Sequence, residues 1–196
     1  MTIIGLTGVS GSGKGYISQI FSTFGVPSID SDAVVHKLYS SGGPCVDELK
    51  SAFGEDITDV NGSIDRKKLG NIVFNDSLQL EKLNGIVHKY VIAEINETIE
   101  SYAGMGYNAV IIDAPQLFEA GVDRNCDHIV SVIADKDIRT KRIVERDGIS
   151  EESAALRINS QHDDCFFISR SDFVIYNSGE DLVPQVKYIL EKTGLI

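Results

Sequence analysis

Several residue types on which whole classes of protein depend are scarce in this chain. Three cysteines, with no C-x-x-C pair, indicate neither a disulfide framework nor a zinc knuckle and favour a reducing compartment. Four prolines and no low-complexity tract argue against a fibrous or largely disordered chain. No apolar run approaches the roughly 18 residues of a membrane span, and the first residues lack the charged start of a signal peptide. We therefore expect a cytoplasmic protein that does not contact membranes.

Basic residues are also in the minority. The chain has 18 Lys+Arg against 29 Asp+Glu, a formal net charge of -11, which argues against nucleic acid as a partner. A small phosphate ligand stays possible, since one local cluster of donors binds it whatever the net charge. Six of the 18 basic residues fall in one stretch: Lys136, Arg139, Lys141, Arg142, Arg146 and Arg157.

What the chain does contain is material for a buried core. It has 196 residues, of which 42% are hydrophobic, and this length suits one domain with insertions. Five apolar runs rich in β-branched residues are continuous rather than alternating, which is typical of parallel strands covered by helices on both faces. The runs are residues 3–7, 26–29, 109–112, 128–133 and 173–176. They predict an α/β fold with right-handed crossovers.

The second and third runs are separated by residues 31–108, a segment too long for one crossover helix. Apolar residues at three- and four-residue intervals predict helical pieces over residues 65–74 and 80–102. Residues 42–44 and 59–63 have the composition of turns. The segment is therefore predicted to be a helical insertion.

A glycine-rich segment links the first apolar run to an apolar helix over residues 17–24. Residues 8–15 read Gly-Val-Ser-Gly-Ser-Gly-Lys-Gly and match G-x-x-x-x-G-K. In this motif backbone N–H groups cradle phosphate oxygens, the helix N-terminus adds positive charge and the lysine reaches the β and γ phosphates. The alternative is a turn that only joins a strand to a helix, for which so many glycines cost needless backbone entropy. We predict ATP binding by Gly8, Gly11, Ser12, Gly13, Lys14, Gly15 and Tyr16.

Position 15 departs from the motif, which continues with Ser or Thr to supply a hydroxyl ligand for Mg²⁺. Here the residue is Gly15, and neither Tyr16 nor Ser18 has the spacing of a substitute. Because magnesium keeps several waters, one more water can take that position. We expect weaker metal handling rather than loss of binding, and the alternative is a nucleotide-binding relative with weak turnover.

Carboxylates follow two of the predicted strands, where ligands of open parallel sheets bind. Asp32, in Asp30-Ser31-Asp32, is the candidate general base that accepts the proton of an attacking hydroxyl. The alternative is that Asp30 or Asp32 only caps the next helix. Asp113 is the candidate Mg²⁺ ligand, and its alternative role is that of a turn residue at the strand end.

A charged helical hairpin is predicted after the fourth strand, with Asp135 as the first cap and Ser150 as the second. Arg139, Arg142 and Arg146 share one face of its first helix. Like charges on one face call for an anion, which ATP phosphates would supply, and Arg142 is the candidate catalytic arginine on the transferred phosphoryl group. The alternative is a solvated surface helix.

In order along the whole chain, these segments resemble the dephospho-coenzyme A kinase family. No segment except the phosphate loop is decisive alone, and the match is specific because all of them occur in the family's order. The matching segments are residues 4–14, Asp30-Ser31-Asp32, residues 65–69 with Val73-Phe74, residues 113–119, Arg142 with Arg146, Arg157 with Gln161, and Asn177-Ser178-Gly179.

The resemblance implies a P-loop kinase core over residues 1–30, 109–135 and 166–196, a helical insertion over residues 31–108 for dephospho-coenzyme A, and a lid over residues 136–165. It also implies that the ribose 3′-hydroxyl attacks the γ phosphate of ATP, with Asp32 as base and with Lys14, the lid arginines and Mg²⁺ stabilising charge. Asn177 and Gly179 then lie at the adenine end. We expect a monomer or weak homo-oligomer.

Three departures from the family pattern are visible. Gly15-Tyr16 stands in place of Ser-Thr, Lys89 in place of proline and Gln116 in place of leucine. The last two are expected in the substrate-side helical region, where they would alter affinity. The competing activity is that of another small-molecule kinase or a nucleoside monophosphate kinase, because the insertion sets the acceptor.

Overall fold

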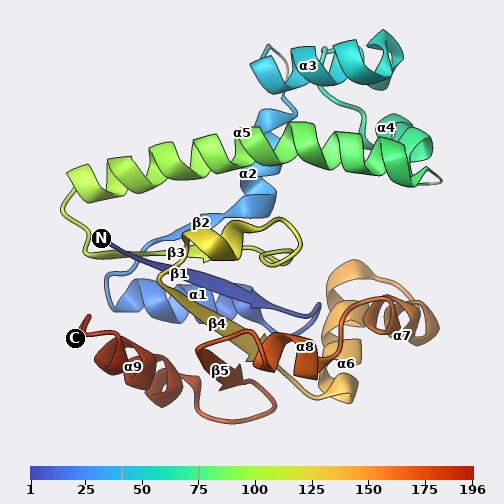
Figure 1. Ribbon diagram of the computed structural model, residues 1–196. Coiled ribbons are helices and arrows are strands. Elements are labelled where there is room, and N and C mark those ends of the chain that lie inside the picture. The colour runs from blue at the N-terminus through green and yellow to red at the C-terminus, as the bar shows by residue number, and fades with distance from the viewer. Residues whose placement is uncertain (41, 75) are drawn as a thin grey trace. The chain divides into compact units, whose positions relative to one another are not determined.

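The computed structural model describes residues 1–40, 42–74 and 76–196 of the chain (Figure 1). Residues Met1–Ile29 and Tyr102–Ile196 form one compact unit, here called the core unit. Residues Asp30–Ser101 form a second, here called the helical unit. The chain thus leaves the core unit once and returns to it once.

The core unit is built on a five-stranded sheet in the order β2-β3-β1-β4-β5. Its central strand, β1, is parallel to β3 and β4, and β4 is parallel to β5. The strands are β1 (Thr2–Gly8), β2 (Ser28–Asp30), β3 (Ala109–Asp113), β4 (His128–Ile133) and β5 (Phe173–Tyr176). Each of the five apolar runs therefore contributes to a strand, although the run over residues 26–29 does so only from Ser28 on, and the predicted α/β fold is confirmed.

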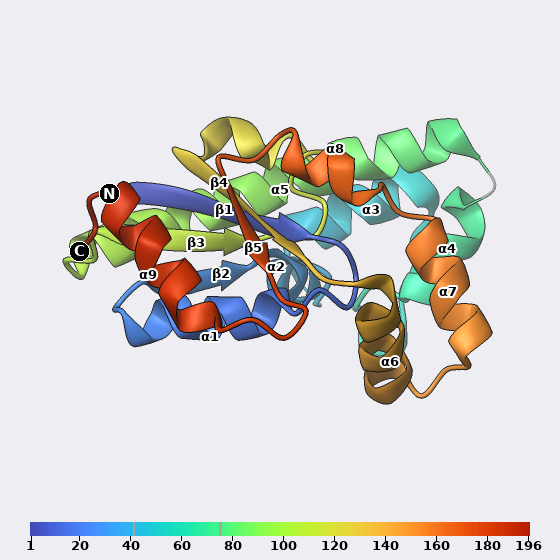
Figure 2. The ribbon, with the colours of Figure 1, turned by 90° about the horizontal axis from the view of Figure 1, so that it is seen from below.

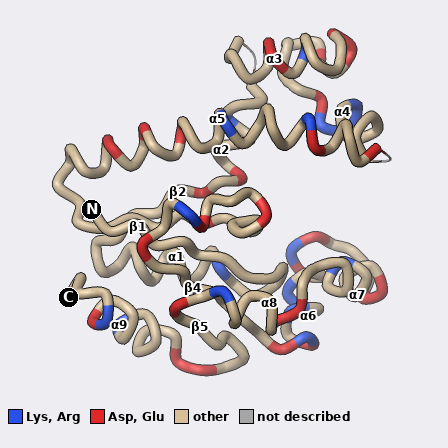
Figure 3. Tube along the Cα trace, viewed as in Figure 1, with Lys and Arg blue, Asp and Glu red and all other residues tan. Residues whose placement is uncertain are grey.

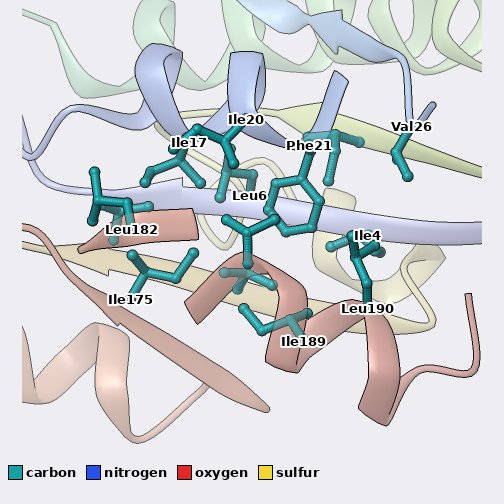
Figure 4. Close-up of a cluster of buried hydrophobic side chains, with 14 of the residues drawn as sticks. Ile4, Leu6, Ile17, Ile20, Phe21, Val26, Ile175, Leu182, Ile189 and Leu190 are labelled. Atoms are coloured by element: carbon teal, nitrogen blue, oxygen red, sulfur yellow. The ribbon is translucent and has the colours of Figure 1, made fainter. Parts of the chain in front are cut away.

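Two helices pack side by side against the sheet: α1 (Lys14–Thr23) and α9 (Leu182–Lys192) (Figures 1 and 2). Figure 4 shows their apolar side chains meeting those of β1 and β5. Phe21 of α1 is completely buried, as are Ile4 and Leu6 of β1. This cluster fixes the start of α1 relative to the end of β1, which is where the glycine-rich loop lies.

A second apolar cluster lies beside the loop. Val9, Ile133 and Phe167 are buried together, and Phe118 and Phe166 pack against them. Phe166 and Phe167 belong to the short helix α8 (Asp164–Ile168), and Phe118 lies in the segment that leads from β3 to the 3-10 helix η2 (Val122–Asn125). The cluster joins the first residues of the loop to the end of β4.

The predicted charged hairpin consists of α6 (Lys136–Asp147) and α7 (Glu151–Asn159). Gly148, in a left-handed conformation, ends α6, and the Ser150 side chain caps α7 by accepting from the Ser153 N–H. Asp135 stands at the N-cap of α6, but its side chain makes no capping bond, so that detail of the prediction is wrong. Figure 2 shows the hairpin at the end of the sheet toward which β1 points.

The helical unit contains α2 (Ser31–Leu38), α3 (Pro44–Phe53), the 3-10 helix η1 (Glu55–Ile57), α4 (Arg66–Val73) and most of α5 (Ser77–Gly104). The predicted turn over residues 59–63 is confirmed, because the Asp59 carboxylate accepts from the N–H groups of Asn61 and Ser63. Of residues 42–44, Pro44 belongs to α3 instead, since its fixed φ suits a first helical position. Within the described ranges, no helix combines the length and apolarity that crossing a membrane requires.

Candidate active site

The backbone of the loop requires glycine at two positions. Gly11 (φ 79°) and Gly13 (φ 91°) both lie in the left-handed region. A Cβ atom at Gly11 would stand 2.7 Å from the carbonyl oxygen of Arg139, so the loop packs directly on the backbone of α6. Gly13 is the N-cap of α1 and makes no side-chain capping bond. The first N–H groups of α1 are therefore left to an external acceptor, which suits an anion.

Side chains from two distant segments hold the loop by its carbonyl groups. Asn177, which is buried at the end of β5, donates from Nδ2 to the Ser12 carbonyl at 2.7 Å. Arg142 of α6 donates from one guanidinium nitrogen to the carbonyls of Gly11 and Ser12, at 3.2 and 3.3 Å. Its other terminal nitrogen donates to the backbone and side-chain oxygens of Asn177, both at 3.2 Å. Because a trans peptide points its C=O and N–H in opposite directions, these bonds turn the Gly13 N–H away from Asn177.

Lys14 and Asp113 face each other at the carboxyl edge of the sheet. Lys14 Nζ lies 3.8 Å from Asp113 Oδ1, and each side chain is only 15% exposed. Lys14 begins α1 and Asp113 ends β3, so the packing of both elements on β1 brings them together. A lysine, a carboxylate and uncapped helix N–H groups at one place are the groups that a magnesium-bound triphosphate needs.

Gly15 leaves room for the hydroxyl that the motif lacks. A Cβ atom built there meets nothing within 4 Å, and its φ is not positive. Tyr16 is 59% exposed. Among the described residues, no group of three or more His, Cys, Asp or Glu side chains is suited to a metal. The site nevertheless fits Mg²⁺, because this ion is commonly held by one or two carboxylates, phosphate oxygens and water. The role of Asp113 as the protein ligand stays a prediction.

Each of the three arginines predicted to face an anion has partners inside the protein, and those of Arg142 are the carbonyl groups described above. Arg139 is 7% exposed and pairs with Asp164 at 3.1 Å, and Arg146 pairs with Asp147 at 2.7 Å. Arg157 of α7 also pairs with Asp147, which joins the two helices of the hairpin. Figure 3 shows this mixture of acidic and basic positions over α6 and α7. The need for an anion is thus met in part by the protein itself, and contact of these arginines with ATP stays a prediction.

Asp147 is expected to titrate well below an ordinary aspartate. The hydrogen bonds from Arg146, with a further contribution from Arg157, lower its pKa from 3.8 to about 2. A depressed carboxyl pKa stabilises the folded hairpin above pH 3.8, and this contribution is lost as the pH falls toward 2. NMR titration of the carboxyl carbon checks this value, and Arg146→Leu should raise it toward 3.8. A wild-type pKa that equals the value in Arg146→Leu would contradict the assignment.

The Asp30-Ser31-Asp32 segment divides two roles between its carboxylates. The side chain of Asp30 caps α2 by accepting from the N–H groups of Asp32 and Ala33, at 2.9 and 3.2 Å. Asp32 lies in the first turn of α2 with its side chain exposed. Capping therefore accounts for Asp30 but not for Asp32. Asp32 belongs to the helical unit, and its role as base stays a prediction.

Other predicted residues are placed as follows. Gly179, after β5, has a positive φ of 129°, and a Cβ atom built there would meet nothing within 4 Å. Arg146 donates from Nε to the carboxylate of Asp147. Gln116 lies on an exposed turn of the core unit, so its assignment to the helical region is wrong. Lys89 pairs with Glu48 at 2.5 Å and so joins α5 to α3. The sequence, in which Lys89 stands in place of the family's proline, did not indicate this contact.

A cavity in the helical unit was not found from the sequence. It measures about 310 Å³ and is lined by His36, Tyr39, Ser40, Asp59, Ser63, Ile64 and Arg66. The guanidinium of Arg66 lies over the ring of Tyr39, 5.5 Å from its centroid. The feature of the sequence that pointed toward this cavity is the Asp65-Arg66 pair. Asp65 caps α4, so Arg66 is the first residue of that helix.

The core unit thus combines a parallel sheet, a glycine loop that opens a helix without a side-chain cap, and a lysine beside a strand-end carboxylate. These features together define a P-loop phosphotransferase.

Comparisons with known proteins extend this assignment. A family described as dephospho-CoA kinase matches residues 2–182. The dephospho-CoA kinase of Fusobacterium nucleatum is 41% identical over 191 residues, 96% of this chain and 97% of that protein. The enzyme of Geobacillus kaustophilus is 39% identical over 191 residues, 96% of this chain and 95% of that protein. The solved structure of the dephospho-CoA kinase from Campylobacter jejuni is similar with a TM-score of 0.70 and 26% identity, covering 99% of this chain and 98% of that chain. The chain belongs to the dephospho-CoA kinase family.

Proposed function

We propose that the protein transfers the γ-phosphoryl group of ATP to the ribose 3′-hydroxyl of dephospho-coenzyme A, which completes coenzyme A. The observation that carries this proposal is the Lys14–Asp113 pair where the glycine loop enters α1. It occurs in a chain whose residues 2–182 match the family. The family membership favours this acceptor over the competing nucleoside monophosphate.

The proposed reaction moves one phosphoryl group and one proton. The loop N–H groups and Lys14 hold the β and γ phosphates, while Asp32 takes the proton of the 3′-hydroxyl. The new bond joins the 3′-oxygen to the γ phosphorus, and the bond from that phosphorus to the bridging oxygen breaks to release ADP. Bound Mg²⁺, with Asp113 as ligand, would neutralise charge on the transferred group. Asn177 and Gly179 follow β5 and are proposed to contact the adenine.

The cavity of the helical unit is the proposed site for part of the acceptor. Arg66 provides a cation for a phosphate group and Tyr39 an aromatic ring within a volume of about 310 Å³. Burial raises the pKa of the Tyr39 hydroxyl, so the ring stays neutral at physiological pH. An acceptor made of a nucleotide and a long pantetheine arm matches such a mixed polar and aromatic surface.

A panel of acceptors in an assay of ADP release tests the proposed function. Dephospho-coenzyme A should be phosphorylated, and nucleoside monophosphates and shikimate should not. Phosphorus NMR of the product should show a monoester on the 3′-oxygen. Turnover of a nucleoside monophosphate without turnover of dephospho-coenzyme A would refute the proposal.

Restoring a hydroxyl at position 15 is expected to strengthen the metal's contribution to ATP binding. Gly15→Ser places its Cβ in open space, so the fold should be unchanged. One added ligand should increase the effect of Mg²⁺ on the Kd of ATP by about threefold to tenfold. Calorimetry with and without Mg²⁺ measures this effect, and Gly15→Ala is the matched control. Equal effects of Mg²⁺ in the serine and alanine variants would show that the hydroxyl does not reach the metal.

We also propose that the enzyme acts in the cytoplasm as a monomer or weak homo-oligomer. The three cysteines are free, and burial raises the pKa of Cys45 to about 11 and that of Cys126 to about 12. The thiols of Cys45 and Cys126 are therefore poor nucleophiles, and free cysteines are typical of a reducing compartment. Sedimentation velocity measures the oligomeric state.

A further inference from the structure

The first half of the glycine loop is held by Gln161, a residue that matches the family pattern together with Arg157 but to which that resemblance assigns no role. The Ser10 N–H donates to Gln161 Oε1 at 2.9 Å, across 151 positions of the sequence. Ser10 lies two residues beyond the end of β1, and Gln161 follows the C-terminus of α7. The bond thus joins the start of the loop to the end of the α6–α7 hairpin.

The segment that contains Gln161 is held in place by contacts on both sides of this residue. Its own N–H donates to the Ile158 carbonyl at 3.3 Å, which ties it to the last turn of α7. The next residue, His162, stacks on Phe166 with 3.7 Å between the ring centroids and 8° between the planes. Phe166 packs against the cluster that contains Val9, the residue before Ser10. Gln161 and the Ser10 N–H that donates to it are therefore both fixed to the same apolar cluster.

The other end of the hairpin also contacts the loop. Gly11 packs on the backbone of Arg139 in α6, and Arg142 one turn later bonds to the carbonyls of Gly11 and Ser12. The loop is thus held by the first helix of the hairpin through its carbonyls and by the end of the hairpin through the Ser10 N–H. Any movement of the hairpin must change these contacts.

We propose that Gln161 is a positioning residue that sets the shape of the phosphate loop and couples it to the α6–α7 hairpin. The amide is suited to this task because it accepts a hydrogen bond without carrying charge. A carboxylate could make the same bond but would place a negative charge beside the site of the triphosphate. The proposal rests on the proposed use of this loop to bind ATP.

Two variants of near-equal size separate the hydrogen bond from the charge. Gln161→Met removes the acceptor, so hydrogen exchange of the Ser10 N–H should accelerate and the Kd of ATP should rise about threefold to tenfold. Gln161→Glu keeps the acceptor, so exchange should stay slow. In this variant the Kd of ATP should still rise, and the increase should shrink at high salt. Gln19→Met, an exposed change on α1, is the control and should alter neither quantity.

The outcomes separate this proposal from the proposed function. If Gln161→Met binds ATP as wild type does, or lowers the melting temperature with no change in the Kd, then Gln161 is only part of the scaffold and the proposal is overturned. Slow exchange of Ser10 in Gln161→Met would overturn it as well. If the variants behave as expected but dephospho-coenzyme A is not phosphorylated, the proposed function fails and the positioning role stands.

Discussion

Lys14→Met is expected to lower kcat/KM for ATP by about 10³-fold, because a preorganised positive charge at the transferred phosphate is removed. Lys14 is the cation paired with Asp113 at 3.8 Å, so the variant also leaves that carboxylate less compensated beside the triphosphate. Both effects oppose charge neutralisation in the transition state. Steady-state kinetics with ATP and dephospho-coenzyme A measure the loss.

The matched control for this variant is Lys187→Met, which removes an exposed lysine of α9 that pairs with Glu191, one turn further along the helix, at 3.8 Å. Its kcat/KM should equal that of wild type. The melting temperature of each variant shows whether the fold is retained. A Lys14→Met enzyme within tenfold of wild type would place the phosphates elsewhere and would remove the basis of the proposed function.

Asp32→Asn is expected to lower kcat by about 10² to 10⁴-fold while the KM for ATP changes little. The amide keeps the size of the side chain and its place in the first turn of α2, but it cannot accept the proton of the 3′-hydroxyl. Rapid-quench measurement of the phosphoryl transfer step separates this loss from slow product release.

Asp30→Asn supplies the control, because asparagine caps a helix nearly as well as aspartate. The hydrogen bonds from the Asp32 and Ala33 N–H groups should persist, because capping needs only an acceptor oxygen, which an amide also provides. Turnover should therefore stay within about twofold of wild type. Equal losses in the two variants would indicate that the segment acts by its charge or its fold and that Asp32 is not the base.

The strands and the loop could be predicted from the sequence because their signals are local. Continuous β-branched runs such as residues 109–112 report burial on both faces, whatever the topology. The glycines of the loop report backbone angles that other residues avoid, and the structure has Gly11 and Gly13 in that region. The caps at Ser150 and Asp30 were local signals too, whereas Asp135 fits the same pattern and does not cap.

The partners of the site residues could not be predicted, because each contact joins residues far apart in the chain. Arg142 and the Gly11 carbonyl are 131 positions apart, and Asn177 and the Ser12 carbonyl are 165 apart. Nothing in residues 139–146 indicates that Arg139 is buried on Asp164 or that Arg142 faces carbonyl groups. The shared face of these arginines was therefore predicted correctly, their partners inside the protein were not predicted, and their contact with ATP stays a prediction.

The α/β fold, the glycine loop, the lysine and the strand-end carboxylates could all be predicted from the sequence, because periodicity and backbone preference are properties of short segments. The kinase activity followed from the loop motif and from the resemblance to a known family. Which groups hold that loop in shape depends on the three-dimensional packing: Arg142 and Asn177 donate to its carbonyls, and Gln161 accepts from the Ser10 N–H. Hydrogen bonds depend on distance and direction in space, and the packing of α6, α7 and β5 around the end of β1 sets both.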